Sequence, residues 1–181
     1  TMWRLRRFGV TPASPSISAV SKRMAERARI SRAVLVLQST LVNVPVTFGW
    51  FKPVILLPVS VVSGLPPSQL EAILAHEMAH IRRYDFLANL LQTLVEAAFF
   101  YHPAVWWLSR QIRVERENCC DDLAASALGG GRELGRALLA IEELRGTATV
   151  LAMGARSGAL VERVRRLSAS EPERGVGAIG G

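Results

Sequence analysis

Residues 33–70 contain a single charged side chain, Lys52, and this apolar stretch constrains the fold more than any other feature. Its length and polarity resemble a membrane-spanning helix, but Pro45, Gly49, Pro53 and Pro58 interrupt it. Proline removes a backbone donor and clashes with the preceding turn, so a continuous helix cannot form here. The runs between these breaks favour strands over residues 34–37, 44–48 and 53–57, with a hairpin connection at 49–52. We expect a small three-stranded sheet in which the prolines place at least one strand at an edge.

The rest of the chain is predicted to be helical. The spacing of apolar residues, together with proline and glycine breaks, predicts helices over about 16–29, 66–83, 84–100, 103–128, 132–144 and 160–167. Ser68 and Glu71 form the pattern of a capping box in the second helix. In the third, one narrow stripe carries the polar residues Asp85, Asn89, Gln92, Thr93 and Glu96, which predicts an amphipathic helix with a wide buried apolar face. The fold class is therefore α+β, mostly helical with a small three-stranded sheet.

The charge of the chain is concentrated near its start. The sequence has 22 basic and 15 acidic residues, a net charge of +7, and residues 1–29 contribute seven of the basic residues and one of the acidic ones. Because the remaining body is nearly neutral and has no aromatic-interleaved basic face, no nucleic acid is expected as a partner. No apolar segment follows the first arginines, as a signal peptide would require. We expect a basic arm (1–15), a folded domain (16–168) and a disordered tail (169–181).

The sequence His76-Glu77-Met78-Ala79-His80 is an H-E-x-x-H motif inside a predicted helix. Four residues make just over one helical turn, so His76 and His80 project from one face at a separation that one zinc ion can bridge. Glu77 lies at the edge of that face, where it can take a proton from water and pass it to a leaving amine. The motif predicts a zinc-dependent hydrolase with Glu77 as its catalytic residue.

A catalytic zinc site takes three protein ligands and keeps a fourth position open. The candidates for the third ligand are acidic residues in the long helix that follows: Glu115, Glu117, Asp121 and Asp122. Glu117 and Asp121 lie four residues apart and share a face, as an arrangement of a ligand and a carboxylate behind a ligand histidine requires. Helical periodicity alone equally permits Glu115 with Asp122, which share another face.

Four stretches of the sequence resemble the BlaR/MecR family of membrane sensor zinc metallopeptidases. They read VPVTFGWFKPVILLP, HEMAHIRRYD, FYHPAVWWLSRQIR and ERENCCDD, and the resemblance extends over about residues 16–168. The family is of the gluzincin type, in which a glutamate of a Glu-x-x-Cys-Asp segment is the third zinc ligand. The resemblance thus implies a zincin-like fold, Zn²⁺ as the metal, Glu117 as a ligand beside His76 and His80, and Asp121 behind a ligand histidine.

The resemblance also implies a cellular role. Members of the family are integral membrane proteins with a cytoplasmic zinc domain, and they hydrolyse peptide bonds in regulatory proteins such as transcriptional repressors. We expect this chain to be the zinc domain of a longer membrane protein, soluble by itself, with its basic arm next to a preceding transmembrane helix. The alternative is an inactive or zinc-stabilised module that binds a partner protein.

Other residues have more than one interpretation. His102 and Tyr101 are candidate stabilisers of a tetrahedral transition state, a role that needs donors near the zinc, but His102 can also simply start the next helix. The adjacent cysteines, Cys119 and Cys120, are expected to be buried small residues rather than metal ligands. Either residues 44–48 or residues 53–57 are expected to form the sheet edge that receives a peptide as an added strand. Arg113 and Arg116 are expected to be exposed helix arginines, with a contact to an acidic neighbour in the site as the alternative. Trp106 and Trp107 are expected to pack in the core rather than stack on a substrate, with a place at the lipid interface of a membrane protein as a further alternative.

Overall fold

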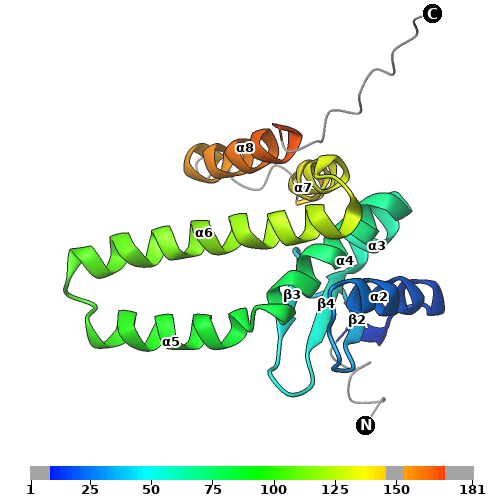
Figure 1. Ribbon diagram of the computed structural model, residues 1–181, viewed down its shortest axis with the longest axis horizontal. Helices are drawn as coiled ribbons and strands as arrows, with labels where there is room; N and C mark the ends of the chain where they lie inside the picture. The colour runs from blue at the N-terminus through cyan, green and yellow to red at the C-terminus, as the bar shows by residue number, and fades with distance from the viewer. Residues whose placement is uncertain (1–8, 146–152, 170–181) are drawn as a thin grey trace, which may run out of the picture.

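The computed structural model describes residues 9–145 and 153–169, which form an α+β fold that is mostly helical (Figure 1). In chain order, the elements are β1 (Val10–Pro12), α2 (Pro15–Arg27), β2 (Leu35–Ser39), β3 (Val46–Phe48), β4 (Val54–Pro58), α3 (Val59–Gly64), α4 (Pro67–Arg82), α5 (Asp85–Ala98), α6 (Pro103–Leu128), α7 (Arg132–Leu144) and α8 (Met153–Ala169). The helices lie within a few residues of their predicted positions, except that α3 was not predicted and α8 begins earlier than expected.

The sheet has four strands rather than the predicted three. Its order is β1-β2-β4-β3, and β1 comes from residues 10–12, in the segment expected to be an arm. β3 and β4 form the predicted antiparallel hairpin, whereas β2 and β4 pair in parallel. β3 is therefore an edge strand, and Pro45 precedes it at a position where no ladder donor is needed. The three-residue strand β1 has a weak sequence signal, because strand prediction rests on longer alternating runs.

Helix α4 lies at the centre of the fold, between the sheet and the helices α2, α6 and α7 (Figure 1). Ten of its 16 residues are buried, and its apolar side chains join those of the sheet in one core cluster. The predicted capping box at its start is wrong. Pro66 occupies the N-cap position without a side-chain bond, and Ser68 Oγ instead bonds to Glu133 on α7. The H-E-x-x-H motif is thus held by tertiary packing on the most buried of the described helices.

Helices α5 and α6 form a long hairpin that extends from the rest of the molecule (Figure 1). The prediction that α5 buries a wide apolar face is wrong, because its buried residues are Asp85 and Gln92 and its apolar side chains are exposed. The exposed apolar side chains of the hairpin are Phe86, Leu90, Leu91, Leu94, Val95, Phe99, Phe100, Tyr101, Trp106, Trp107, Leu108, Ile112 and Val114. The expected core packing of Trp106 and Trp107 is therefore wrong, because the hairpin extends beyond the core (Figure 1). Among the described residues, no helix combines the length and the apolar character needed to cross a membrane.

Helices α7 and α8 pack on the opposite end of α6. Gly129 ends α6 in the left-handed conformation (φ 77°), which confirms that the run of three glycines ends this helix. At Gly131 a Cβ atom would lie 2.6 Å from the carbonyl oxygen of Leu167, so glycine permits the close approach of α8. This packing brings two arginines of α8, Arg163 and Arg166, against the acidic segment of α6. The predicted arm and tail lie largely outside the described residues.

Candidate functional site

The two histidines of the motif lie on one face of α4 with their rings facing the same point. His76 Nε2 and His80 Nε2 are 3.2 Å apart. His76 is buried and His80 is partly buried, so both rings have little freedom to turn away. The helical spacing of four residues thus gives the geometry that the sequence predicted.

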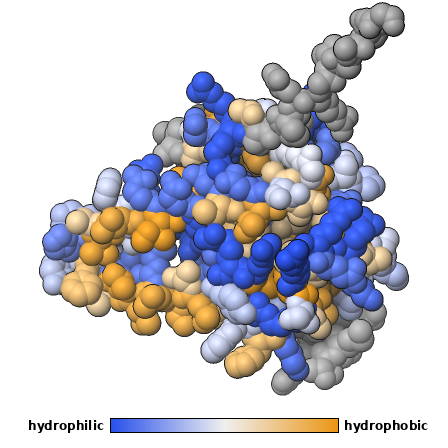
Figure 2. Space-filling view, viewed as in Figure 1, coloured by the Kyte–Doolittle hydropathy of each residue, from blue (hydrophilic) through white to orange (hydrophobic). Residues whose placement is uncertain are grey.

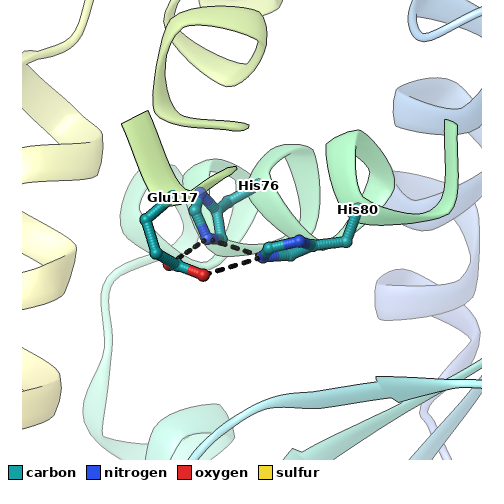
Figure 3. Close-up of side chains that lie close together, drawn as sticks. All are labelled: His76, His80 and Glu117. Carbon is teal, nitrogen blue, oxygen red and sulfur yellow. Dashed lines mark hydrogen bonds and ion pairs between the residues drawn. The ribbon is translucent and has the colours of Figure 1, made fainter. Parts of the chain in front are cut away.

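Glu117 on α6 completes the group (Figure 3). Its Oε2 atom lies 3.6 Å from His76 Nε2, and its Oε1 atom lies 3.9 Å from His80 Nε2. Two ligand atoms at about 2.0–2.1 Å from a tetrahedral zinc ion are about 3.3–3.4 Å apart. The three side chains already lie at nearly this separation, and two imidazoles with one carboxylate are a ligand set that suits zinc.

The structure distinguishes the two pairs of acidic residues, Glu117 with Asp121 and Glu115 with Asp122, between which helical periodicity could not decide. Asp121 is fully buried behind His76, whereas Glu115 is exposed and Asp122 pairs at the surface with Arg166. Among the described residues, Glu117 is the carboxylate that groups with both motif histidines. Burial raises the pKa of Glu117, but the neighbouring His76, Arg163 and His80 lower it by more, so the net pKa is below its ordinary value.

Each histidine also has a carboxylate next to its other ring nitrogen. His80 Nδ1 bonds to Asp85 Oδ2 at 2.7 Å. His76 Nδ1 lies 3.1 Å from Asp121 Oδ1, close enough for an ion pair, although the direction of the ring N–H does not make a good hydrogen bond. A carboxylate at Nδ1 favours the tautomer that carries its proton there and leaves Nε2 free to bind a metal.

Arg163 on α8 holds Asp121 in place. Its Nε atom donates to Asp121 Oδ2 at 2.8 Å, and Nη2 donates to Oδ1 at 2.7 Å. Nη1 also lies 3.2 Å from Glu117 Oε2. Burial raises the pKa of Asp121, but the bonds from Arg163 and the nearby His76 ring lower it below its ordinary value. A residue 42 positions away therefore keeps this carboxylate ionised behind the site.

The pKa of His76 is raised to about 9 in the metal-free protein. Burial lowers it, but the carboxylates of Asp121, Glu117 and Glu77 raise it by more. The site is thus rich in negative charge and stabilises a cation at the position of the ring nitrogens. A divalent metal ion would take the place of this proton.

A second group of possible ligands shares His80 with the first. Cys120 Sγ donates to Asp85 Oδ2 at 3.2 Å and lies 3.3 Å from His80 Nδ1. Burial and the negative charge of Asp85 raise the pKa of the Cys120 thiol far above its ordinary value. Because a metal binds the thiolate, Cys120 is better suited to orienting Asp85 than to binding a metal. The expectation that Cys120 is buried is confirmed, and Cys119 is partly buried.

His76, Glu77, His80 and Glu117 line a cavity of about 300 Å³ beside the sheet. The edge strand β3 lies along it through Val46 and Thr47, and Arg116 and Glu117 line the side formed by α6. Thr47 Oγ1 donates a hydrogen bond to Glu77 Oε2, which links the sheet edge to the motif. Since β4 lies inside the sheet, β3 rather than residues 53–57 is the edge next to the cavity.

Not every candidate residue lies at the cavity. His102 and Tyr101 are exposed at the far end of the α5–α6 hairpin and do not line it (Figure 1). His102 instead is the N-cap of α6, where its Nδ1 accepts a bond from Ala104 N, so the structure does not bring these two residues to the site. Arg116 is buried at the cavity rather than exposed, whereas Arg113 pairs with Glu96 in the hairpin.

Comparison with known proteins gives the family. The family model for BlaR1 peptidase M56 matches residues 3–167. The chain belongs to this family of peptidases. The resemblance inferred from the motifs is therefore confirmed.

Relatives within the family match a shorter part of the chain. The Regulatory protein BlaR1 of Bacillus licheniformis is 33% identical over 96 residues, which are 53% of this chain and 16% of that protein. The Methicillin resistance mecR1 proteins of Staphylococcus aureus and Staphylococcus epidermidis are 29% identical over 83 residues, which are 46% of this chain and 14% of each protein. The aligned part of the chain thus spans less than a fifth of the length of these relatives.

Three residues at the site were not predicted. Asp85 was noted as part of a polar stripe, and its position five residues after His80, at the start of α5, is a signal that could have linked it to the histidine. Thr47 comes from the sheet, and Arg163 comes from the last helix. No local pattern marks either of them, because their roles depend on how distant segments pack.

Proposed function

We propose that this member of the M56 family is a gluzincin-like zinc endopeptidase whose site is built from His76, His80 and Glu117. The observation that carries the proposal is the convergence of these three side chains, with ligand atoms that all lie within 4.8 Å of one another, at the mouth of a cavity next to Glu77. Two histidines and a carboxylate leave a fourth position for water, as hydrolytic zinc sites require.

The residues around the metal have distinct tasks in this proposal. When bound, zinc supplies a Lewis acid that activates water and polarises the scissile carbonyl group. Glu77 accepts a proton from the attacking water as the new C–O bond forms, and it returns a proton to the amine nitrogen as the C–N bond breaks. Asp121 and Asp85 keep the histidine rings oriented, and Thr47 fixes one oxygen of the Glu77 carboxylate.

The edge strand β3 is the proposed seat of the substrate. An extended peptide can add to its free edge through main-chain hydrogen bonds, which places a peptide bond in the cavity with little dependence on side-chain identity. Val46, Thr47 and Trp50 line the cavity, and the partly exposed Val46 and Trp50 offer apolar contacts. A regulatory protein with an exposed, extended segment is therefore the proposed substrate class, and a transcriptional repressor is one such protein.

The cellular setting is proposed from the relatives. Their names, Regulatory protein BlaR1 and Methicillin resistance mecR1 protein, point to signalling and antibiotic resistance. We place this chain as the cytoplasmic protease domain of a membrane-bound sensor, attached through flanking transmembrane segments of a longer protein. Cleavage of the regulatory protein would then convert an external signal into a change in gene expression.

The test is a comparison of Glu77→Gln with Glu115→Gln, which removes the same charge at an exposed position of α6. Both variants and the unmodified chain are loaded with zinc, and their metal content and cleavage of a proteome-derived peptide library are measured. Glu77→Gln should retain zinc and lose cleavage by at least about 100-fold, while Glu115→Gln should match the unmodified chain. Equal cleavage by zinc-loaded Glu77→Gln would contradict the mechanism. Zinc binding without any cleavage by the unmodified chain would favour a partner-binding module.

A further inference from the structure

We propose that the α5–α6 hairpin inserts its tip into one leaflet of a lipid bilayer that carries anionic headgroups. This inference depends neither on zinc nor on the proposed peptidase activity, and it is separate from attachment through flanking segments. It rests on the inverted polarity of the hairpin: the side chains that it buries near the interface are the polar Asp85, Gln92 and Ser109, whereas its large apolar side chains lie on its surface (Figure 2).

Two polar contacts join the helices of the hairpin on its inner side. Gln92 is buried, and its Nε2 atom donates to the carbonyl oxygen of Ser109 at 2.8 Å. Glu96 pairs with Arg113 at 2.8 Å across the same interface. A helix pair in water places such groups outside and its apolar stripe inside. The reverse arrangement is the one that a hydrocarbon environment requires.

The tip is also prepared for a medium without water. The indole N–H of Trp106 donates to the carbonyl oxygen of Phe100 at 2.7 Å, and His102 caps the first turn of α6. These bonds satisfy main-chain groups that the turn between the helices would otherwise leave open. Unpaired main-chain groups are costly in hydrocarbon, so this turn can enter lipid with less penalty than an uncapped one.

The apolar surface surrounds the hairpin rather than forming one face. The consecutive residues Trp106, Trp107 and Leu108 are 48%, 61% and 51% exposed, although they point in directions about 100° apart on the helix. On α5, Leu91 and Leu94 are 64% and 60% exposed. A second copy of the chain or another protein covers one side of a helix, whereas lipid can surround it. The distribution therefore favours a bilayer over a protein partner.

Length and charge fix how deep the hairpin can go. With 14 residues, α5 is about 21 Å long, which is shorter than the hydrocarbon core of about 30 Å. Residues 86–112 contain two charged side chains, the inward-facing Glu96 and the exposed Arg110. Arg110 has no ion pair among the described residues and lies seven residues from the start of α6, about 10 Å along the helix. With Arg110 held at the level of anionic headgroups, the tip can therefore reach about 10 Å below it, close to the depth of about 5–10 Å to which interfacial helices bury their apolar side chains.

Insertion would bring the cavity close to the membrane surface. Asp85, Phe86 and Asn89 in the first turns of α5 line the cavity, so the hairpin and the site share the same helix end. A substrate segment near the bilayer would be favoured over one far from it.

The first experiment measures vesicle binding and depth for the whole 181-residue chain. A variant with Trp3→Phe and Trp50→Phe retains Trp106 and Trp107 of the hairpin as its only tryptophans, so its tryptophan emission reports on the hairpin alone. Its emission is measured with phosphatidylcholine vesicles, with and without phosphatidylglycerol, that contain lipids brominated at known depths. We expect strong quenching by shallow acyl-chain bromines and tighter binding when phosphatidylglycerol is present. Binding without quenching would overturn the proposal.

The second experiment assigns the binding to the hairpin. Leu94→Gln with Trp107→Gln is compared with Leu41→Gln and Val161→Gln, which change side chains of similar exposure (68% and 60%) outside the hairpin. The hairpin variant should bind vesicles about tenfold or more weakly, and the control should bind as the unmodified chain does. Equal binding by both variants, with binding lost when Arg4, Arg6 and Arg7 are replaced by Gln, would assign it to the basic arm and overturn the proposal. The proposal would also be overturned if the unmodified chain did not bind vesicles but formed a dimer, and the hairpin substitutions made it monomeric.

Discussion

The variant Arg163→Met tests how the last helix supports the site. The substitution keeps an apolar stem of similar length but removes the two bonds, at 2.8 and 2.7 Å, that hold the fully buried Asp121. Breaking a buried ion pair by removing one partner costs about 3–5 kcal/mol, because the other charge stays buried without compensation. Since 19% of the Arg163 side chain is exposed, and His76 at 3.1 Å and Arg166 at 3.9 Å still face Asp121, we expect the low end, about 3 kcal/mol.

Two measurements follow from this magnitude. For a chain of this size, a loss of about 3 kcal/mol in the free energy of unfolding lowers the melting temperature by about 6–12 °C. Asp121 also lies against His76, a proposed zinc ligand, so zinc affinity should fall by about 10–100-fold in a competition titration with a chelating dye. Urea unfolding of the metal-free chain separates the first effect from the second.

Arg165→Met is the matched control, because Arg165 is exposed on the same helix and the substitution removes the same charge. It should change the free energy of unfolding by less than about 0.5 kcal/mol. In a double-mutant cycle, Asp121→Asn should remove most of the additional cost of Arg163→Met. If Arg163→Met unfolds and binds zinc as Arg165→Met does, the proposed support of the site by α8 is wrong.

Three further predictions concern the site itself. Asp85→Asn should lower zinc affinity about 10–100-fold in the same titration, because an amide no longer holds His80 Nδ1 as a carboxylate does; an unchanged affinity would contradict the role of Asp85. Thr47→Val should keep zinc but lower kcat about tenfold, because Glu77 loses a hydrogen bond; an unchanged kcat would show that this bond does not position the base. The pKa of His76 is about 9 in the folded metal-free chain against 6.5 unfolded, so its contribution to stability is complete below pH 6.5 and is lost as pH rises through about 9; urea unfolding at pH 6 and pH 10 measures this loss, and greater stability at pH 10 would refute it.

The features predicted from the sequence are local ones. The H-E-x-x-H motif fixed two histidines on one helix face, and proline and glycine breaks gave most helix boundaries, because both depend on residues within a turn or two. Periodicity left Glu115 and Glu117 open, and the family resemblance selected Glu117, the one that the structure groups with His76 and His80.

The features missed by the sequence depend on distant packing or on the surroundings. The parallel pairing of β2 with β4 and the contact of Arg163 with Asp121 join segments that no local pattern relates. The inversion of α5 was missed for another reason. A hydrophobic stripe shows that one face of a helix avoids water, but it does not show whether a protein core or another medium covers that face.

The most direct test of the account is the position of zinc in a crystal of the zinc-loaded chain, located by anomalous diffraction on both sides of the zinc absorption edge. We predict one peak, about 2.0–2.1 Å from His76 Nε2, His80 Nε2 and an oxygen of Glu117. Zinc bound instead by Cys120, Asp85 and His80 Nδ1, the other group of possible ligands among the described residues, would contradict the central claim.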